Sequence, residues 1–280
     1  MKLLVTGATG LLGSALVEDA RQRGYDVVAL AREQLDVTDA AGVGEVVSGE
    51  RPDYVVHCAA YTAVDRAEAE PGLAMAVNRD GARNVAVAAA GAGAVPVYVS
   101  TDYVFDGAKR SPYLPDDPPS PLSVYGRTKL EGELATAEAA LEHLIVRTSW
   151  LYGEDRGFVP AILRRAQAGQ GLRVVDDQVG RPTWAPQAAE AILGLIERGA
   201  RGVWHVGAGG ACTWLDLARE TLRRAGLDAP VDPISTEEFG AAAPRPAYSV
   251  LDLTATETAL GRKMTDWRES LSRFLEERDG

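Results

Sequence analysis

Short apolar runs alternate with amphipathic stretches along the first 150 residues of the chain. The apolar runs have the length and near-continuous hydrophobicity of strands that are buried on both faces. They predict strands at Leu3–Thr6, Val27–Ala31, Tyr54–Cys58, Val95–Ser100 and His143–Arg147. Helical spacing between them predicts helices at Leu12–Arg23, Leu73–Ala90 and Ser123–Ala139. Alternating strands and helices indicate an α/β fold built on a doubly wound parallel sheet.

The second half of the chain is less regular. Its helical patterns lie at Phe158–Ala168, Gln187–Glu197, Thr213–Ala225 and Asp266–Glu277, where Thr213 and Asp266 are predicted N-caps. A further strand is predicted at Gly202–Val206. We expect residues 1–157 to form the main core and residues 158–280 mainly a smaller, interleaved lobe that returns segments to it. Residues 106–122 form a long irregular segment with five prolines, and long loops of compact domains are often functional.

Three glycines, Gly7, Gly10 and Gly13, follow the first predicted strand and open the first predicted helix. Gly7 permits a tight turn, Gly10 lets the backbone approach a pyrophosphate, and Gly13 allows close packing of the helix. The free N–H groups at the helix start would hold the phosphates. A glycine triplet alone can be a simple strand–helix turn, but in this position it predicts a dinucleotide-binding turn.

The end of the second strand indicates which dinucleotide is bound. An acidic residue there would hydrogen-bond the adenosine ribose of NAD, whereas an arginine accommodates the 2′-phosphate of NADP. Leu30 is not acidic and Arg32 follows it, so we predict NADPH as the preferred cofactor. NADH is retained as an alternative because Glu33 is adjacent. We expect Asp36 and Val37 to border the adenine.

Tyr125 and Lys129 are four residues apart at the start of a predicted helix, so both point to one face. A neutral tyrosine can protonate a carbonyl oxygen as it becomes an alkoxide, and a nearby ammonium would lower the high pKa of that tyrosine. Ser100 and Thr101 follow a buried strand, at the edge where doubly wound sheets bind ligands. Either hydroxyl could steady the developing oxyanion.

Composition and charge exclude several classes of function. The formal net charge is −11 and no basic block is present, which argues against nucleic-acid binding. No apolar run approaches the roughly 20 residues that a membrane-spanning helix needs, and the first residues are predicted as a strand instead of a secretion signal. Cys58 and Cys212 lie in apolar surroundings, as free thiols do in a reducing cytosol. Together with the lack of a secretion signal, these thiols predict a cytoplasmic protein. The three histidines lack metal-ligand spacing, so we expect no metal site.

The glycine turn, the strand-end hydroxyls and the tyrosine–lysine pair resemble the extended short-chain dehydrogenase/reductase superfamily, whose core is a Rossmann fold. More narrowly, almost the whole chain is similar to the dTDP-4-dehydrorhamnose reductase family. The segments that carry this resemblance are Gly7–Gly13, Ala59–Glu68, Ser100–Gly107, Tyr125–Lys129, Arg147–Gly153, Asp177–Thr183 and Arg245–Ser249. Ser100–Gly107 is the most particular to the family, whereas the tyrosine–lysine pair is shared by the superfamily. Cys58 departs from the family pattern, in which asparagine is common.

The resemblance implies roles for individual residues. Thr101, Tyr125 and Lys129 would be the catalytic trio. Cofactor contacts are implied for Gly10, Leu11, Leu12, Asp36, Val37, Ala59, Ala60, Tyr61, Thr62, Val99, Tyr125 and Lys129. Sugar contacts are implied for Val64, Thr101, Asp102, Tyr103 and Trp150, whose flat apolar ring also suits a deoxysugar. Arg181 or Arg245, and with less support Arg262, would bind the diphosphate.

The resemblance further implies that NAD(P)H reduces the C4 keto group of dTDP-4-keto-6-deoxy-L-mannose, with Tyr125 as the proton donor, to give dTDP-L-rhamnose. A reductase of another dTDP-4-keto-deoxysugar and a nucleotide-sugar epimerase remain open. A 4,6-dehydratase is disfavoured, because such enzymes typically carry Asp-Glu after the threonine and Asp102-Tyr103 stand here. A non-catalytic regulatory subunit, like the reductase-like partner of methionine adenosyltransferase, could retain the same residues. Monomer and homodimer are both compatible with the apolar content.

Overall fold

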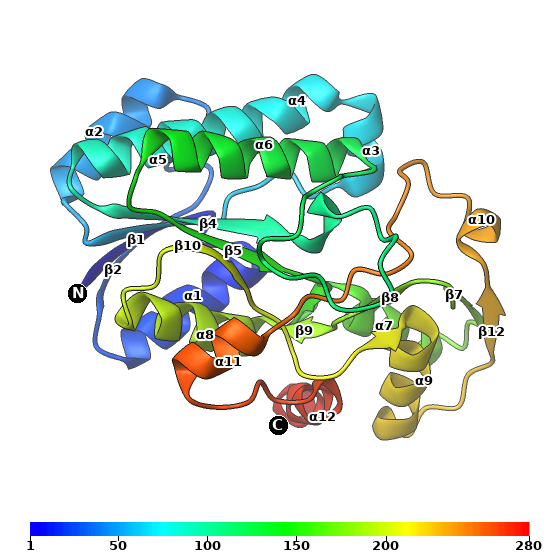
Figure 1. Cartoon of the computed structure of the whole chain (residues 1–280). Helices are drawn as coiled ribbons and strands as arrows, with labels where there is room; N and C mark the ends of the chain where they lie inside the picture. The colour runs from blue at the N-terminus through cyan, green and yellow to red at the C-terminus, as the bar shows by residue number, and fades with distance from the viewer. Residues whose placement is uncertain (280) are drawn as a thin grey trace.

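Six parallel strands form the central sheet of the chain, which a computed structural model describes over residues 1–279 (Figure 1). In spatial order they are β10 (Gly202–His205), β5 (Leu144–Thr148), β4 (Val95–Thr101), β3 (Tyr54–His57), β1 (Lys2–Thr6) and β2 (Asp26–Leu30). Each predicted strand lies within one residue of the observed one at both ends. The predicted α/β class and doubly wound sheet are therefore confirmed.

Helices cover both faces of this sheet (Figure 1). One face carries α2 (Ala40–Glu50), α5 (Gly81–Gly91) and α6 (Val124–Ala139), and the other carries α1 (Leu11–Gln22) and α8 (Ala185–Glu197). The chain passes from β1 to β2 on one side and then to β3 on the other. The carboxyl ends of β1 and β3 thus form a topological switch point, where open α/β sheets bind ligands.

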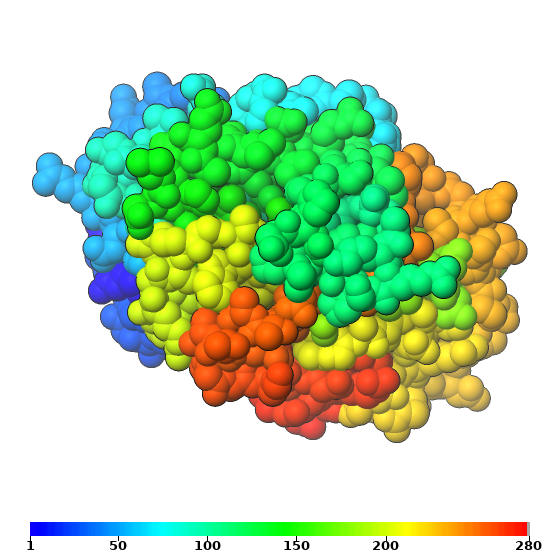
Figure 2. Space-filling model, viewed as in Figure 1, coloured from blue at the N-terminus to red at the C-terminus, as the bar shows by residue number. Residues whose placement is uncertain are grey.

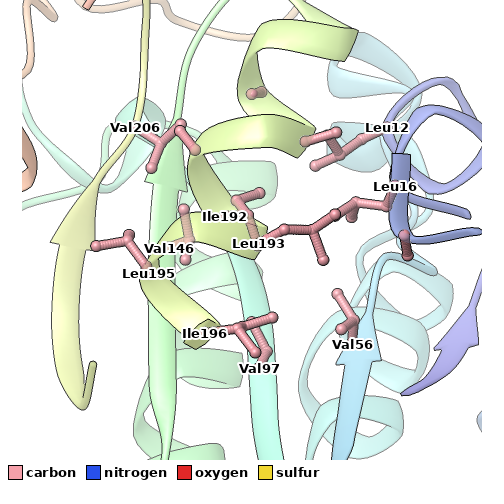
Figure 3. Close-up of a cluster of buried hydrophobic side chains, with 14 of the residues drawn as sticks. Leu12, Leu16, Val56, Val97, Val146, Ile192, Leu193, Leu195, Ile196 and Val206 are labelled. Carbon is pink, nitrogen blue, oxygen red and sulfur yellow. The ribbon is translucent and has the colours of Figure 1, made fainter. Parts of the chain in front are cut away.

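The main apolar core lies between the sheet and the pair α1 and α8. Leu12 and Leu16 of α1 meet Ile192 and Leu193 of α8 over strand residues such as Val56 (Figure 3). All five side chains are at most 5% exposed. Because α8 and β10 come from the second half of the chain, that half helps to build the first core.

A second group of elements surrounds two further cores at the other end of the molecule. Its helices are α7 (Phe158–Gln167), α9 (Trp214–Ala225) and α12 (Trp267–Asp279), with α10 (Thr236–Phe239) in a connection. Helix α11 (Thr254–Leu260) packs instead on the main core, against α8 and β10. The strands of the second group pair in twos: β7 (Leu172–Val175) with β12 (Val231–Ile234), β6 (Leu151–Tyr152) with β9 (Thr183–Trp184), and β8 (Val179–Gly180) with β11 (Cys212–Thr213). Thr213 caps α9 with a capping box, as predicted.

The helix predicted at Leu73–Ala90 consists of three consecutive pieces. These are α4 (Pro71–Met75), a π-helical turn η1 (Ala76–Asp80) and α5. Short π-helical turns occur frequently at functional sites. The turn places Asn78 in the interior, where it is 0% exposed. Over the described part of the chain, no helix combines the length and apolarity needed to cross a membrane.

Candidate functional site

The glycine-rich turn lies at the switch point between β1 and β3. Gly7 has φ +64°, and a Cβ on it would lie 2.6 Å from the backbone nitrogen of Ala59. A Cβ on Gly13 would lie 2.3 Å from the carbonyl oxygen of Gly7. Only glycine fits at these two positions, because the turn, β3 and α1 approach one another closely.

The start of α1 is open to an anion. Its N-cap, Gly10, provides no side-chain hydrogen bond, and the first turn carries no acidic residue. The leading N–H groups of the helix are consequently available for a phosphate. A cavity of about 510 Å³ lies beside the turn and is lined in part by Thr9, Arg21 and Gln34. These features fit the diphosphate and adenosine of a dinucleotide.

The residues predicted to meet the adenine end follow β2. Arg32 is exposed, whereas Val37 is only 5% exposed and contributes to the core. The Asp36 carboxylate accepts hydrogen bonds from the backbone N–H of Thr38 at 2.9 Å and from its hydroxyl at 2.7 Å. These bonds hold the pKa of Asp36 below its usual value. Asp36 is thus an ionised residue at the rim of the predicted site.

Asn78 is a site residue that the sequence reasoning missed. Its side chain accepts a hydrogen bond from the Tyr61 N–H at 2.8 Å and donates to the Tyr61 carbonyl at 3.1 Å. It also donates to the Thr128 hydroxyl at 2.9 Å. Asn78 therefore ties the segment after β3, which carries the predicted cofactor residues Ala59, Ala60, Tyr61 and Thr62, to helix α6. A lone asparagine within an amphipathic pattern gives no sequence signal for this role.

The predicted catalytic trio meets at the carboxyl end of β4. Thr101 is the last residue of β4, and Tyr125 and Lys129 occupy the first two turns of α6. Ser123 fixes the start of α6 by accepting a hydrogen bond from the Gly126 N–H at 3.1 Å. The Thr101 hydroxyl lies near enough to Tyr125 to favour the ionised form of that tyrosine and so to lower its pKa. The structure thus brings together the strand-end hydroxyl and the tyrosine that the sequence placed 24 residues apart.

The pKa values of Tyr125 and Lys129 differ from the expectation. Burial raises the pKa of Tyr125 to about 12, and the Thr101 hydroxyl opposes that rise. Burial also lowers the pKa of Lys129 to about 7. The lysine donates to the Val99 carbonyl at 2.6 Å and lies 4.1 Å above the Tyr98 ring. The expected lowering of the tyrosine pKa by Lys129 is wrong for this structure, because the side chain is directed at β4 and burial dominates.

The predicted sugar contacts come from three segments of the chain, of which only Asp102 and Tyr103 directly adjoin the trio. Val64 begins α3 (Val64–Ala69), and Asp102 and Tyr103 form the short helix η2 (Asp102–Val104) directly after Thr101. The ring of Tyr103 lies edge-on to that of Tyr125, with 5.6 Å between centroids. Trp150 stacks on Trp214 with ring centroids 3.4 Å apart, so this indole also packs within the second lobe.

The three arginines proposed for the diphosphate have different partners. Arg181 donates to the carbonyl oxygens of Leu251, Ala208 and Gly210 at 2.7, 3.1 and 2.5 Å. Its Nε and Nη1 groups therefore anchor these loops, and its contact with the diphosphate stays a prediction. Arg262 pairs with Glu190 of α8 at 2.8 Å. Arg245 pairs with Asp65 at 2.8 Å. Its charge also acts to lower the pKa of Tyr103, so of the three arginines Arg245 is the one near the trio.

The same described residues contain no group of three or more histidines, cysteines or acidic side chains placed to hold a metal ion. The candidate site therefore consists of a phosphate-binding turn, a hydroxyl pair, a buried lysine and flanking aromatic rings. This set can bind a dinucleotide and transfer a proton to a neighbouring oxygen.

The chain is similar to known proteins along almost its whole length. The family model described as "RmlD substrate binding domain" matches residues 1–279. A dTDP-4-dehydrorhamnose reductase from Streptomyces griseus is 44% identical over 96% of this chain and 91% of its own length. A dTDP-4-keto-6-deoxy-D-glucose reductase from Streptomyces niveus is 41% identical over 96% of this chain and 94% of its own. The crystal structure of dTDP-4-dehydrorhamnose reductase from Bacillus anthracis in complex with NADP superposes with a TM-score of 0.95, at 41% identity over 99% of both chains.

Proposed function

The chain belongs to the RmlD substrate binding domain family of extended short-chain dehydrogenases/reductases, and from that premise we propose that it is a dTDP-4-dehydrorhamnose reductase. The reaction is the NAD(P)H-dependent reduction of the C4 keto group of dTDP-4-keto-6-deoxy-L-mannose, which yields dTDP-L-rhamnose. The observation that carries the proposal is the placement of Thr101 at the end of β4 and of Tyr125 and Lys129 at the start of α6, with Lys129 buried and bonded to the Val99 carbonyl of β4.

The chain's own residues supply binding and proton transfer, and a bound nicotinamide cofactor supplies the hydride. The N-terminus of α1 and the turn at Gly7–Gly13 hold the diphosphate. Tyr125 would give its hydroxyl proton to the C4 oxygen as that oxygen gains negative charge, and Thr101, whose own proton is donated to Asp102, lies beside Tyr125. The raised pKa of Tyr125 keeps this residue protonated before the reaction. Lys129 would hold the cofactor ribose in position.

Two further observations support the choice of NADPH, and a third supports a cytoplasmic reaction. Arg32 is exposed at the end of β2, where a 2′-phosphate would be placed. The Bacillus anthracis relative, at 41% identity, was crystallised with NADP. Both Cys58 and Cys212 are free thiols, in keeping with a reducing compartment.

The test is loss of the near-ultraviolet absorbance of NADPH, and separately of NADH, with enzymatically prepared dTDP-4-keto-6-deoxy-L-mannose. We expect rapid oxidation with stoichiometric formation of dTDP-L-rhamnose. The same assay with dTDP-4-keto-6-deoxy-D-glucose separates the two substrates named for the Streptomyces relatives. Tight cofactor binding without turnover of either sugar contradicts the proposal and favours a regulatory subunit.

A further inference from the structure

Residues 241–252, here called the C-terminal strap, run between the two lobes beside the candidate site. The backbone of Ala243 donates to Asp65 of α3 at 3.0 Å. The strap pairs with Val179 of β8 through two backbone hydrogen bonds of 2.8 and 2.9 Å. It also pairs with Tyr113 of the proline-rich loop, and Gly107 of that loop lies against Pro246. Figure 2 shows this loop, in green, and the orange strap region bordering each other at the surface.

Ser249 is the strap residue that reaches the catalytic strand end. Its hydroxyl donates to the Asp102 carboxylate at 2.5 Å. Ser249 is 2% exposed and Asp102 is 1% exposed, so water does not compete for this bond. A hydrogen bond to a buried carboxylate is among the stronger ones in proteins.

Asp102, held by Ser249, in turn binds the hydroxyl of Thr101. Its second carboxylate oxygen accepts from the Thr101 hydroxyl at 3.1 Å. The Thr101 oxygen accepts in turn from the Tyr103 N–H at 3.2 Å. A threonine hydroxyl has one proton and two lone pairs, so Asp102 and Tyr103 together fix its orientation and leave one lone pair for a further donor.

We propose that Ser249 is a positioning residue, which holds the Asp102 carboxylate so that Asp102 in turn orients the Thr101 hydroxyl beside Tyr125. The inference rests on the proposed reductase function. Both carboxylate oxygens of Asp102 are engaged inside the protein, one by each hydroxyl. The strap thereby couples the packing of the second lobe to the geometry of the catalytic hydroxyl. Such preorganisation matters because small displacements of a catalytic group cost large factors in rate.

The experiment measures kcat, KM and the NADPH dissociation constant for the full chain and for Ser249→Ala. We expect kcat to fall by about tenfold, as for loss of one hydrogen bond to a charged group, while NADPH affinity stays unchanged. The matched control is Ser270→Ala on α12. Ser270 is 1% exposed and donates to Gln187 at 2.8 Å, so the control removes an equally buried hydroxyl away from the trio. A raised KM with unchanged kcat, or a fall in kcat equal to that of the control, overturns the inference.

A double-mutant cycle with Thr101→Ala separates positioning from general damage. If Ser249 acts through Thr101, adding Ser249→Ala to the Thr101→Ala variant changes kcat less than about twofold. An equal fall in both backgrounds overturns the inference. Should Ser249→Ala fail to fold, Ser249→Cys keeps the volume but donates only weakly, and we expect the same loss. Turnover that is insensitive to Ser249 overturns only this inference, whereas absence of turnover in the unsubstituted protein overturns the proposed function and the inference together.

Discussion

The ammonium nitrogen of Lys129 lies 2.6 Å from the carbonyl oxygen of Val99, on the same strand that ends in Thr101. This bond fixes the lysine to β4, although Lys129 itself is on α6. The side chain is 3% exposed. Burial lowers the pKa of Lys129 to about 7. The negative charge of Glu133 raises this pKa but does not outweigh burial. Near neutral pH the lysine therefore exchanges readily between its charged and neutral forms, and either form can donate to the carbonyl.

The first prediction concerns the pH dependence of stability. The folded-state pKa of Lys129 is about 7, below the ordinary lysine value of 10.5. Between these values the unfolded chain binds the extra proton, so this residue makes the folded protein more stable as pH rises from about 7. Lys129→Met removes the effect. From pH 7 to pH 9 the unfolding free energy of the unsubstituted protein should gain about 2 kcal/mol relative to the variant. Urea unfolding of both proteins at each pH measures this change, and a constant difference contradicts it.

The second prediction concerns the proton donor. Tyr125→Phe removes the hydroxyl near Thr101 but keeps the ring that packs edge-on against Tyr103. We expect kcat to fall by about 10²–10⁴-fold, the usual contribution of a general acid. NADPH affinity and the circular dichroism spectrum should stay unchanged. Turnover close to that of the unsubstituted protein would remove Tyr125 from the mechanism.

Sequence patterns predicted the central sheet and the trio because these features depend on local signals. Buried parallel strands are short apolar runs, and the spacing of Tyr125 and Lys129 is set by one helix. Helix α2 was missed because its pattern contains Gly42, Gly44 and Gly49, which are poor helix formers. Its N-cap Asp39, which accepts from the N–H groups of Ala41 and Gly42, was the available signal.

Other features depend on contacts between distant segments. The pair β7 and β12 joins residues about 60 positions apart, and such short strands have no periodicity long enough to detect. The bond from Ser249 to Asp102 spans 147 positions. The direction of the Lys129 side chain was also beyond prediction, because it is decided by a carbonyl on another element. The sequence therefore indicated which groups lie close together, while their orientation required the tertiary structure.

The third prediction concerns cofactor choice. Arg32→Ala should weaken NADPH binding by about tenfold or more, the value of one hydrogen bond to a charged group, and leave NADH binding unchanged. Arg83→Ala, at an exposed position of α5, is the matched control for loss of a surface charge. Dissociation constants from fluorescence titration measure both effects. Equal weakening of the two cofactors would contradict the assignment of Arg32 to the 2′-phosphate.

The last prediction concerns the buried ion pair behind the site. Arg147 binds both carboxylate oxygens of Glu133, at 2.9 and 2.7 Å, and each side chain is 4% exposed. The Ser100 hydroxyl donates to the same carboxylate at 2.5 Å, and Arg147 also donates to the Pro115 carbonyl of the proline-rich loop. The pair thus joins α6, β4, β5 and that loop.

Glu133→Gln leaves the guanidinium of Arg147 buried without a counter-charge, so the unfolding free energy should fall by about 3–5 kcal/mol. The comparable exposed pair is Glu142 with Arg201, whose side chains are 73% and 33% exposed. Glu142→Gln should cost less than about 0.5 kcal/mol, because water screens that pair. Loss of the Glu133 charge should also lower the pKa of Lys129 further, since that charge raises it. Urea unfolding of both variants measures the first two effects. Equal losses from the two substitutions would mean that the buried pair is not needed to hold the helix that carries Tyr125 and Lys129 against the sheet.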